Sequence, residues 1–141
     1  GPYFLGYEDG EQIVFQASEI PGEDLEGFPL VLRKDAAEAW NDLLELACRD
    51  GIDIRPSYAY RSNHTQKKLW VQSPKLAAKP GHSPHQTGTA IDINGTTAIV
   101  RGKRYKTEIY WWLKMKASRF GFYQTIDHEP WHWVYFPGEN V

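Results

Sequence analysis

Two separated segments carry the side chains that most constrain how this chain can fold. The first, at positions 83–92, reads SPHQTGTAID, and the second, at positions 129–132, reads EPWH. His85, Asp92 and His132 are of the residue types that bind zinc in catalytic sites, where three protein ligands leave a fourth position for water. The fold must therefore bring both segments to one point, and Glu129 is then left free to act as a base.

The spacing in the first segment favours a loop that enters a strand. His85 and Asp92 are seven positions apart and cannot be neighbours on one helix face. A turn at Gly88 that leads into a strand over residues 89–93 can bring both to one ion, unlike the helical H-E-x-x-H arrangement. Alternation along this strand turns Asp92 toward the site and its two isoleucine neighbours toward the core.

The second segment offers a ligand and a general base. Pro130 disfavours a helix, so we expect an extended approach to a last strand over residues 131–136. His132 can then face the metal, with Glu129 beside the bound water. Zinc lowers the pKa of its water toward about 7, and a nearby carboxylate takes the proton as the hydroxide attacks a carbonyl.

The reaction also needs a cation near the developing negative charge. Arg61 is the candidate for this role, because guanidinium groups donate charge-assisted hydrogen bonds to oxyanions. A structural ion pair with Asp53 or Asp92 is the alternative for this arginine. We expect no direct metal contact from the remaining histidines, which are His64, His82 and His128. The alternative for His82 and His128 is a hydrogen bond to one of the metal ligands.

Local patterns predict the surrounding elements. Apolar residues recur at helical spacing over residues 36–47, with Asp35 as the N-cap, Gly51 as the stop signal and Cys48 as a buried thiol. Further helices are predicted from a cap at Ser62 to residue 70, and over residues 107–118. Extended segments are expected at 12–16, 29–32, 52–58 and 122–125, and loops at Pro21 and Gly22 and at 72–81.

Length and charge bound the remaining possibilities. We expect a single domain over residues 3–141, present as a monomer, with Gly1 and Pro2 as the remnant of a cleaved tag. The net charge of -2 gives no basic excess for nucleic-acid binding, so the basic groupings at 67–68 and 101–104 are predicted to be solvated faces. The single cysteine excludes an intrachain disulfide, and no apolar run approaches the roughly 20 residues of a membrane span.

The two motifs together show a specific resemblance. S-x-H-x-x-G-x-A-x-D followed by E-x-W-H resembles the zinc carboxypeptidases of the LAS group, especially the vancomycin-resistance type D,D-carboxypeptidases and the related L,D-carboxypeptidases of peptidoglycan. The resemblance covers residues 58–136 and implies an α+β fold, with a small, mainly antiparallel sheet that carries Zn²⁺ and helices packed on it. The implied site residues are the ligands His85, Asp92 and His132, the general base Glu129, the carboxylate or oxyanion binder Arg61, and the substrate contacts Ser83, Gln66 and Tyr60.

The resemblance also implies a substrate and a location. It predicts removal of a C-terminal D-alanine from peptidoglycan stem peptides in the bacterial cell envelope, in the periplasm or otherwise outside the cytoplasm. The family often has Ser-Gly-Tyr-Arg where this chain has Tyr58-Ala59-Tyr60-Arg61, and this departure favours L,D-specificity (tetrapeptide to tripeptide) over D,D-specificity (pentapeptide to tetrapeptide). The alternatives are a peptidoglycan endopeptidase of the endolysin or autolysin type and a non-enzymatic zinc-containing binding domain. The presence of both Glu129 and Arg61 argues against the second.

Overall fold

The computed structural model describes residues 2–138, in which helices are combined with strands that pair only in antiparallel fashion. The strands are β1 (Tyr3–Glu8), β2 (Glu11–Glu23), β3 (Pro29–Arg33), β4 (Pro56–Tyr58), β5 (Ala90–Ile93), β6 (Thr97–Val100), β7 (Lys103–Lys106), β8 (Phe122–Gln124) and β9 (His132–Tyr135). The helices are α1 (Lys34–Arg49), α2 (Asn63–Gln72) and α3 (Glu108–Lys116), with the short 3-10 helices η1 (Pro84–Thr87) and η2 (Ala117–Phe120). The predicted α+β class is confirmed.

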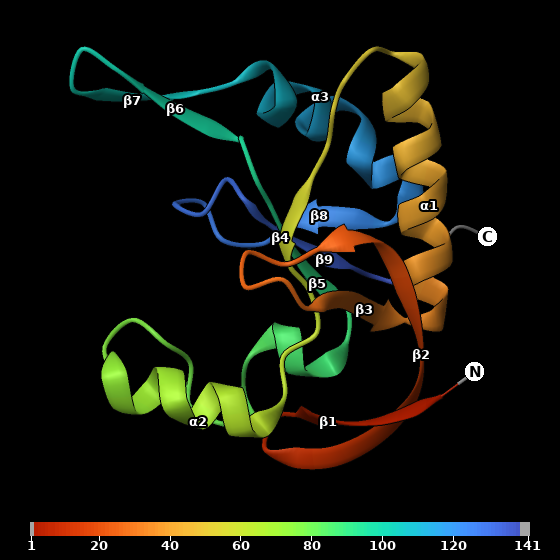
Figure 1. Cartoon of the computed structure of the whole chain (residues 1–141), viewed down its shortest axis with the longest axis vertical. Coiled ribbons are helices and arrows are strands. Elements are labelled where there is room, and N and C mark those ends of the chain that lie inside the picture. Colours follow the sequence, from red (N-terminus) through yellow and green to blue (C-terminus); the bar gives the residue numbers. More distant parts are fainter. Residues whose placement is uncertain (1, 139–141) are drawn as a thin grey trace.

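The strands of the described chain form three sheets (Figure 1). β1, β2 and β3 make a three-stranded sheet in that order, β4, β5, β9 and β8 make a four-stranded sheet, and β6 and β7 form a separate hairpin. In the four-stranded sheet Asp92 on β5 lies directly opposite His132 on β9. This sheet therefore joins the two segments that the motifs predict to meet.

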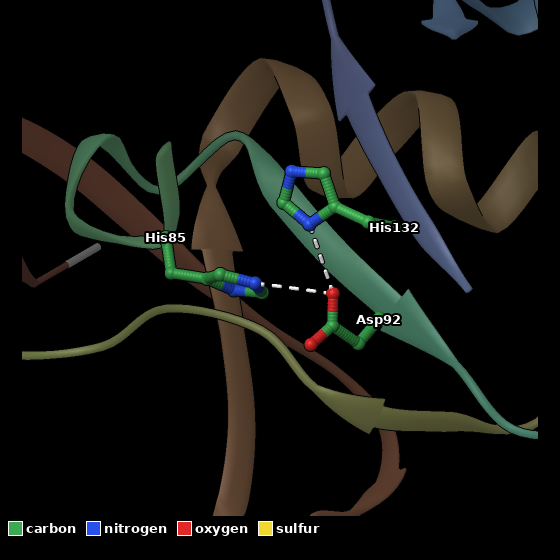
Figure 2. Close-up of side chains that lie close together, drawn as sticks. All are labelled: His85, Asp92 and His132. Carbon is green, nitrogen blue, oxygen red and sulfur yellow. Dashed lines mark hydrogen bonds and ion pairs between the residues drawn. The ribbon is translucent and has the colours of Figure 1, made fainter. Parts of the chain in front are cut away.

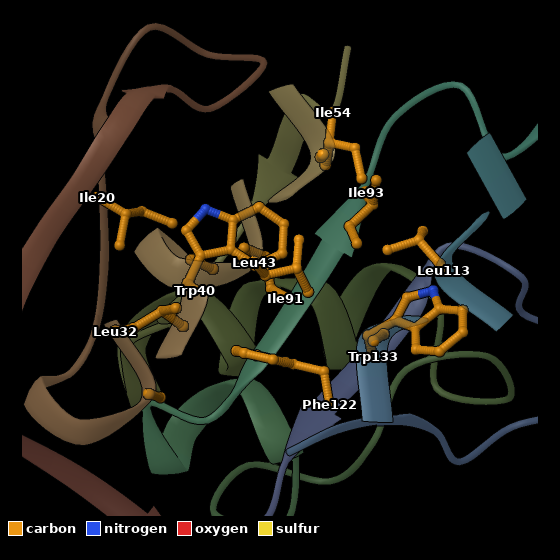
Figure 3. Close-up of a cluster of buried hydrophobic side chains, with 14 of the residues drawn as sticks. Ile20, Leu32, Trp40, Leu43, Ile54, Ile91, Ile93, Leu113, Phe122 and Trp133 are labelled. Carbon is orange, nitrogen blue, oxygen red and sulfur yellow. The ribbon is translucent and has the colours of Figure 1, made fainter. Parts of the chain in front are cut away.

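One hydrophobic core includes buried residues of both α1 and the four-stranded sheet (Figure 3). Trp40 of α1 is fully buried and meets Phe122 of β8 edge-on, with 5.7 Å between the ring centroids. From β5, Ile91 and Ile93 are buried in the same core, so Asp92 between them faces away from it. Burial of each such apolar side chain contributes about 1.5–3 kcal/mol to stability and holds the strand in one orientation.

The capping residues predicted from the sequence are correct for α2 and wrong for α1. Ser62 caps α2 as predicted, because its Oγ accepts a hydrogen bond from the backbone N–H of Thr65. The predicted N-cap at Asp35 is wrong: α1 begins at Lys34, and Asp35 lies in its first turn. There the carboxylate pairs with Arg33 through contacts of 2.6 and 2.8 Å, which removes it from the capping position. No helix within residues 2–138 has the length and apolar character needed to cross a membrane.

Other local expectations also need correction. Pro21 and Gly22, predicted as a loop, belong to β2, where a register shift between Ile20 and Glu23 takes the proline out of the ladder. Cys48 is exposed rather than buried, because the core face of α1 runs through Ala47 and not through its neighbour. Strand β1 and the β6–β7 hairpin were not predicted. Of the two residues expected to be a tag remnant, Gly1 lies outside the described residues.

Gly88 occupies a position near the site where the fold has no room for a side chain. Its φ of +75° is left-handed, and a Cβ there would lie 2.7 Å from a ring carbon of Phe15 and 3.1 Å from the backbone nitrogen of Arg33. Gly51 has a similar φ of +73°, but a Cβ there would meet nothing within 4 Å. A side chain at Gly51 would therefore cause backbone strain alone, whereas one at Gly88 would cause both backbone strain and a steric clash.

We expect Gly88→Ala to destabilise the protein by about 2–5 kcal/mol, of which about 1–2 comes from the left-handed backbone and the rest from overpacking. Gly51→Ala carries only the backbone term. Urea unfolding of both variants and the wild type measures the difference. Equal losses would show that Phe15 and Arg33 move aside at no cost and that the turn is not tightly packed.

Candidate metal centre

His85, Asp92 and His132 converge on one point (Figure 2). His85 Nε2 lies 3.1 Å from Asp92 Oδ1, and His132 Nδ1 lies 3.0 Å from the same oxygen. One ligand atom from each of the three residues falls within 4.8 Å of the others. Both histidines are buried and Asp92 is partly buried, so the three groups form a compact, largely enclosed donor set.

The backbone around η1 fixes the orientation of His85. Its Nδ1 lies 2.7 Å from the carbonyl oxygen of Ala59, so this nitrogen donates to the carbonyl and Nε2 is turned toward Asp92. The backbone N–H of Arg61 donates to the carbonyl of His85, and the Oγ of Ser83 accepts from the backbone N–H of His85. Ala59 thus fixes the imidazole ring of His85, and Arg61 and Ser83 fix its backbone.

Asp92 and His132 are positioned by strand pairing instead. Asp92 is the register partner of both Tyr58 on β4 and His132 on β9, so these three side chains share one face of the sheet. Burial opposes ionisation of Asp92, but the hydrogen bonds from His132 and His85 outweigh it and hold the pKa of this carboxyl below its usual range. The centre therefore offers an ionised carboxylate together with two imidazoles.

This donor set suits a metal ion. Two imidazole nitrogens and one carboxylate oxygen are the ligands that catalytic zinc sites use, with a further position left for water or substrate. A carboxylate that stays ionised and an imidazole with its second nitrogen bound to a backbone carbonyl are both prepared for coordination. The geometry can therefore hold one ion through His85 Nε2, Asp92 Oδ1 and His132 Nδ1.

Arg61 lies beside this centre and is held by α2. Its Nη1 donates to Gln66 Oε1 at 2.9 Å, and the buried Gln66 in turn donates to the carbonyl of Ala78 at 2.7 Å. Burial lowers the pKa of the Arg61 guanidinium, while the negative charge of Asp92 opposes that shift. The alternative pairing of Arg61 with Asp53 is not formed in the described chain, where Asp53 pairs with Arg55 at 3.0 Å.

Glu129 is tied to the centre through the backbone. Its carbonyl accepts the backbone N–H of His132 at 3.0 Å, and its side chain is partly exposed. Within residues 2–138, its carboxylate has one ion-pair contact, with His128 Nε2 at 3.9 Å. Its role as a base therefore remains a prediction.

The other predicted substrate contacts have partners within the protein. The hydroxyl of Tyr60 donates to the carbonyl of Leu5 at 2.7 Å, and its ring packs edge-on against Phe4 and Phe15. The hydroxyl of Ser83 accepts from the backbone N–H of His85. Both residues thus help to build the site, and their contact with a substrate stays a prediction. The remaining histidines, which are His64, His82 and His128, are exposed and lie outside the three-residue cluster.

Sequence reasoning missed the carbonyl of Ala59, which directs the Nε2 of His85 toward Asp92. A backbone carbonyl has no side-chain signature, so no motif could have identified it. The pairing of Tyr58 with Asp92 was also missed, because β4 is only three residues long and shows no clear alternation.

Comparisons with known proteins agree with this geometry. The family model described as VanY, D-alanyl-D-alanine carboxypeptidase, matches residues 29–138. A D-alanyl-D-alanine carboxypeptidase of Enterococcus faecalis is 27% identical over 122 residues, which cover 67% of this chain and 44% of that protein. The chain spans less than half the length of the curated relatives that it matches.

Solved structures extend the comparison to the fold. The LdcB LD-carboxypeptidase superposes with a TM-score of 0.68 and 25% identity, covering 85% of this chain and 67% of that one. A mutant of the vancomycin-resistance D,D-pentapeptidase VanY, solved in complex with Zn(II), has a TM-score of 0.60 and 24% identity over 84% of this chain and 83% of its own. The family match covers most of the chain and includes His85, Asp92 and His132. The chain therefore belongs to the VanY family of D-alanyl-D-alanine carboxypeptidases.

Proposed function

We propose that this protein is a zinc-dependent carboxypeptidase that removes a C-terminal D-alanine from peptidoglycan stem peptides. The observation that carries the proposal is the convergence of His85 Nε2, Asp92 Oδ1 and His132 Nδ1 within 4.8 Å of one another, in a chain of the VanY family. Such a substrate places the activity in the bacterial cell envelope, outside the cytoplasm. We propose that the protein acts there as a monomer and that residues 3–141 form one domain.

Zinc is the proposed ion because the site offers three ligand atoms, two imidazole nitrogens and one carboxylate oxygen. The VanY mutant of similar fold was also solved with Zn(II). A zinc ion bound there would polarise a carbonyl group and lower the pKa of the water that it binds to about 7. Each of the three residues contributes one ligand atom, so coordination positions would remain for the water and the substrate carbonyl.

The chain's own groups then divide the remaining work. Glu129, beside His132 in the chain, accepts the proton of the attacking water at its carboxylate and returns it to the leaving amine. Arg61 keeps its guanidinium aligned through Gln66 and has further N–H groups free to bind the substrate's terminal carboxylate or the developing oxyanion. Because Arg61 is partly buried, each of these bonds is stronger than it would be in water.

We further propose that the L,D reaction is preferred. Tyr58 lies opposite Asp92 across β4 and β5 and therefore borders the site, where burial raises the pKa of its phenol. This ring stands where the family often has a serine, and it narrows the space available beside the reacting bond. The LdcB LD-carboxypeptidase superposes on this chain with a higher TM-score than the D,D-pentapeptidase VanY, 0.68 against 0.60, which supports the same choice.

Mass spectrometry of muropeptides tests the proposed reaction directly. Purified tetrapeptide and pentapeptide are incubated with zinc-loaded protein and, in parallel, with chelator. We expect the tetrapeptide to lose one alanine in the zinc-loaded sample only, and Tyr58→Ser to increase cleavage of the pentapeptide relative to the tetrapeptide. Cleavage of the pentapeptide alone by the wild type would overturn the L,D assignment, and cleavage only within crosslinked dimers would indicate an endopeptidase.

Glu129→Ala should separate catalysis from metal binding. We expect kcat to fall by about 10²–10⁴-fold because the proton acceptor is lost, while one zinc per chain remains bound. Asp127→Ala, which removes an exposed acid two residues earlier, is the matched control and should leave kcat unchanged. Steady-state kinetics and elemental analysis measure the two quantities. Zinc lost from the Glu129 variant, or unchanged turnover, would exclude Glu129 as the base.

A further inference from the structure

The β6–β7 hairpin projects from the body of the molecule, at the opposite end from α2 (Figure 1). Every residue of the hairpin strands is exposed except the partly buried Thr97, so neither face is covered by another element. The base of the hairpin is fastened by Thr107, whose N–H donates to the carbonyl of Thr96 at 3.0 Å and whose Oγ1 donates to that of Gly95 at 2.6 Å. A two-stranded hairpin with both faces in water is marginally stable, which suggests that this one has a partner.

The hairpin is strongly basic in a protein that is slightly acidic. Residues 97–106 include Arg101, Lys103, Arg104 and Lys106 and no acid, whereas the whole chain has a net charge of -2. In the part of the chain that the structure describes, none of these four cations forms a salt bridge. The β6–β7 hairpin therefore presents uncompensated positive charge on its surface.

Apolar side chains are interleaved with these cations. Ile99 is paired with Arg104 across the hairpin and Val100 with Lys103, so each face combines an aliphatic group with a cation. Ile99 is 68% exposed and Val100 is 54% exposed. At the base, the ammonium group of Lys106 lies over the rings of Tyr110 and the exposed Trp111, at 4.8 and 5.7 Å from their centroids.

The turn of the hairpin places a cation at its tip against local preference. Arg101 and Gly102 have φ values of +52° and +77°, which define a two-residue turn with both central residues left-handed. Such turns favour Asn or Asp before the glycine, and the β1–β2 turn follows this rule with Asp9 and Gly10. Arginine in the same position is less suited to the turn and puts a cation at the exposed tip of the hairpin.

We infer that the β6–β7 hairpin docks the protein onto an anionic lipid membrane surface. With the tip of the hairpin pointing at the bilayer, Arg101, Lys103 and Arg104 meet the lipid phosphates, while Ile99 on one face and Val100 on the other enter the headgroup region. A soluble polyanion would need only the cations, whereas the boundary of a bilayer accommodates both charges and aliphatic groups. The hairpin follows β5, the strand that carries Asp92, so docking would tether the body of the protein and its candidate metal centre to the membrane.

Vesicle cosedimentation tests this inference on the whole chain. We expect the protein to sediment with phosphatidylglycerol and phosphatidylcholine vesicles mixed in equal parts, to remain in solution with pure phosphatidylcholine, and to bind less as salt is raised. The combined variant Arg101→Gln, Lys103→Gln, Arg104→Gln should bind the anionic vesicles about 100-fold more weakly, because each cation near such a surface contributes about fivefold.

A control variant with the same loss of charge makes the comparison specific. Lys67→Gln, Lys68→Gln, Lys75→Gln removes three exposed cations from α2 and the loop after it, at the other end of the molecule. We expect this variant to bind as the wild type does. Thermal unfolding of both variants checks that each still folds. Neither vesicle binding nor thermal unfolding depends on enzymatic activity.

The apolar residues distinguish a membrane from a soluble polymer. Ile99→Ser with Val100→Ser should weaken binding to the anionic vesicles and leave any binding to poly(glycerol phosphate) unchanged. The inference would be overturned by the absence of vesicle binding or by equal losses in the two charge variants. Vesicle binding that is insensitive to Ile99→Ser and Val100→Ser, with equally tight binding to the polymer, would assign the hairpin to a polyanion instead.

Discussion

The antiparallel register of β5 and β9 is the constraint on which the rest of the site depends. It sets Asp92 directly opposite His132, so a proposed ligand from the middle of the chain meets a second one from near its end. A slip of one residue would turn Asp92 into the core and bring Ile91 or Ile93 to the metal. The burial of these two isoleucines, packed with Trp40 and Phe122, makes that slip costly. The hydrophobic core thus fixes the geometry of the polar face.

Around this pair, the site is held mainly by backbone contacts. His85 is oriented by the carbonyl of Ala59 and by the N–H of Arg61, and Glu129 is linked to His132 through its own carbonyl. The guanidinium of Arg61 instead relies on a side chain, that of the buried Gln66 on α2. Groups fixed in this way need little rearrangement when an ion or substrate binds, which is the condition for efficient electrostatic catalysis.

The sequence was most informative where chemistry and local geometry coincide. The convergence of His85, Asp92 and His132 could be predicted because their types, their spacing around Gly88 and their strand context all favour a metal site. The cap at Ser62 could be predicted because capping is a local interaction. The predictions failed where a distant or neighbouring partner decides the outcome. Asp35 does not cap α1 because its carboxylate pairs with Arg33. Pro21 can lie within β2 because the register shifts around it. The β6–β7 hairpin lacks the buried face that makes a strand visible as alternation.

The central claim is that His85, Asp92 and His132 together hold one zinc ion. X-ray absorption at the zinc K-edge of the zinc-loaded protein tests this claim most directly, because imidazole, carboxylate and thiolate ligands scatter differently. The account predicts two imidazole nitrogens and at least one oxygen at about 2.0–2.2 Å and no sulfur. A sulfur scatterer at about 2.3 Å, which could come only from Cys48 or Met115, or a shell without imidazole, would contradict it.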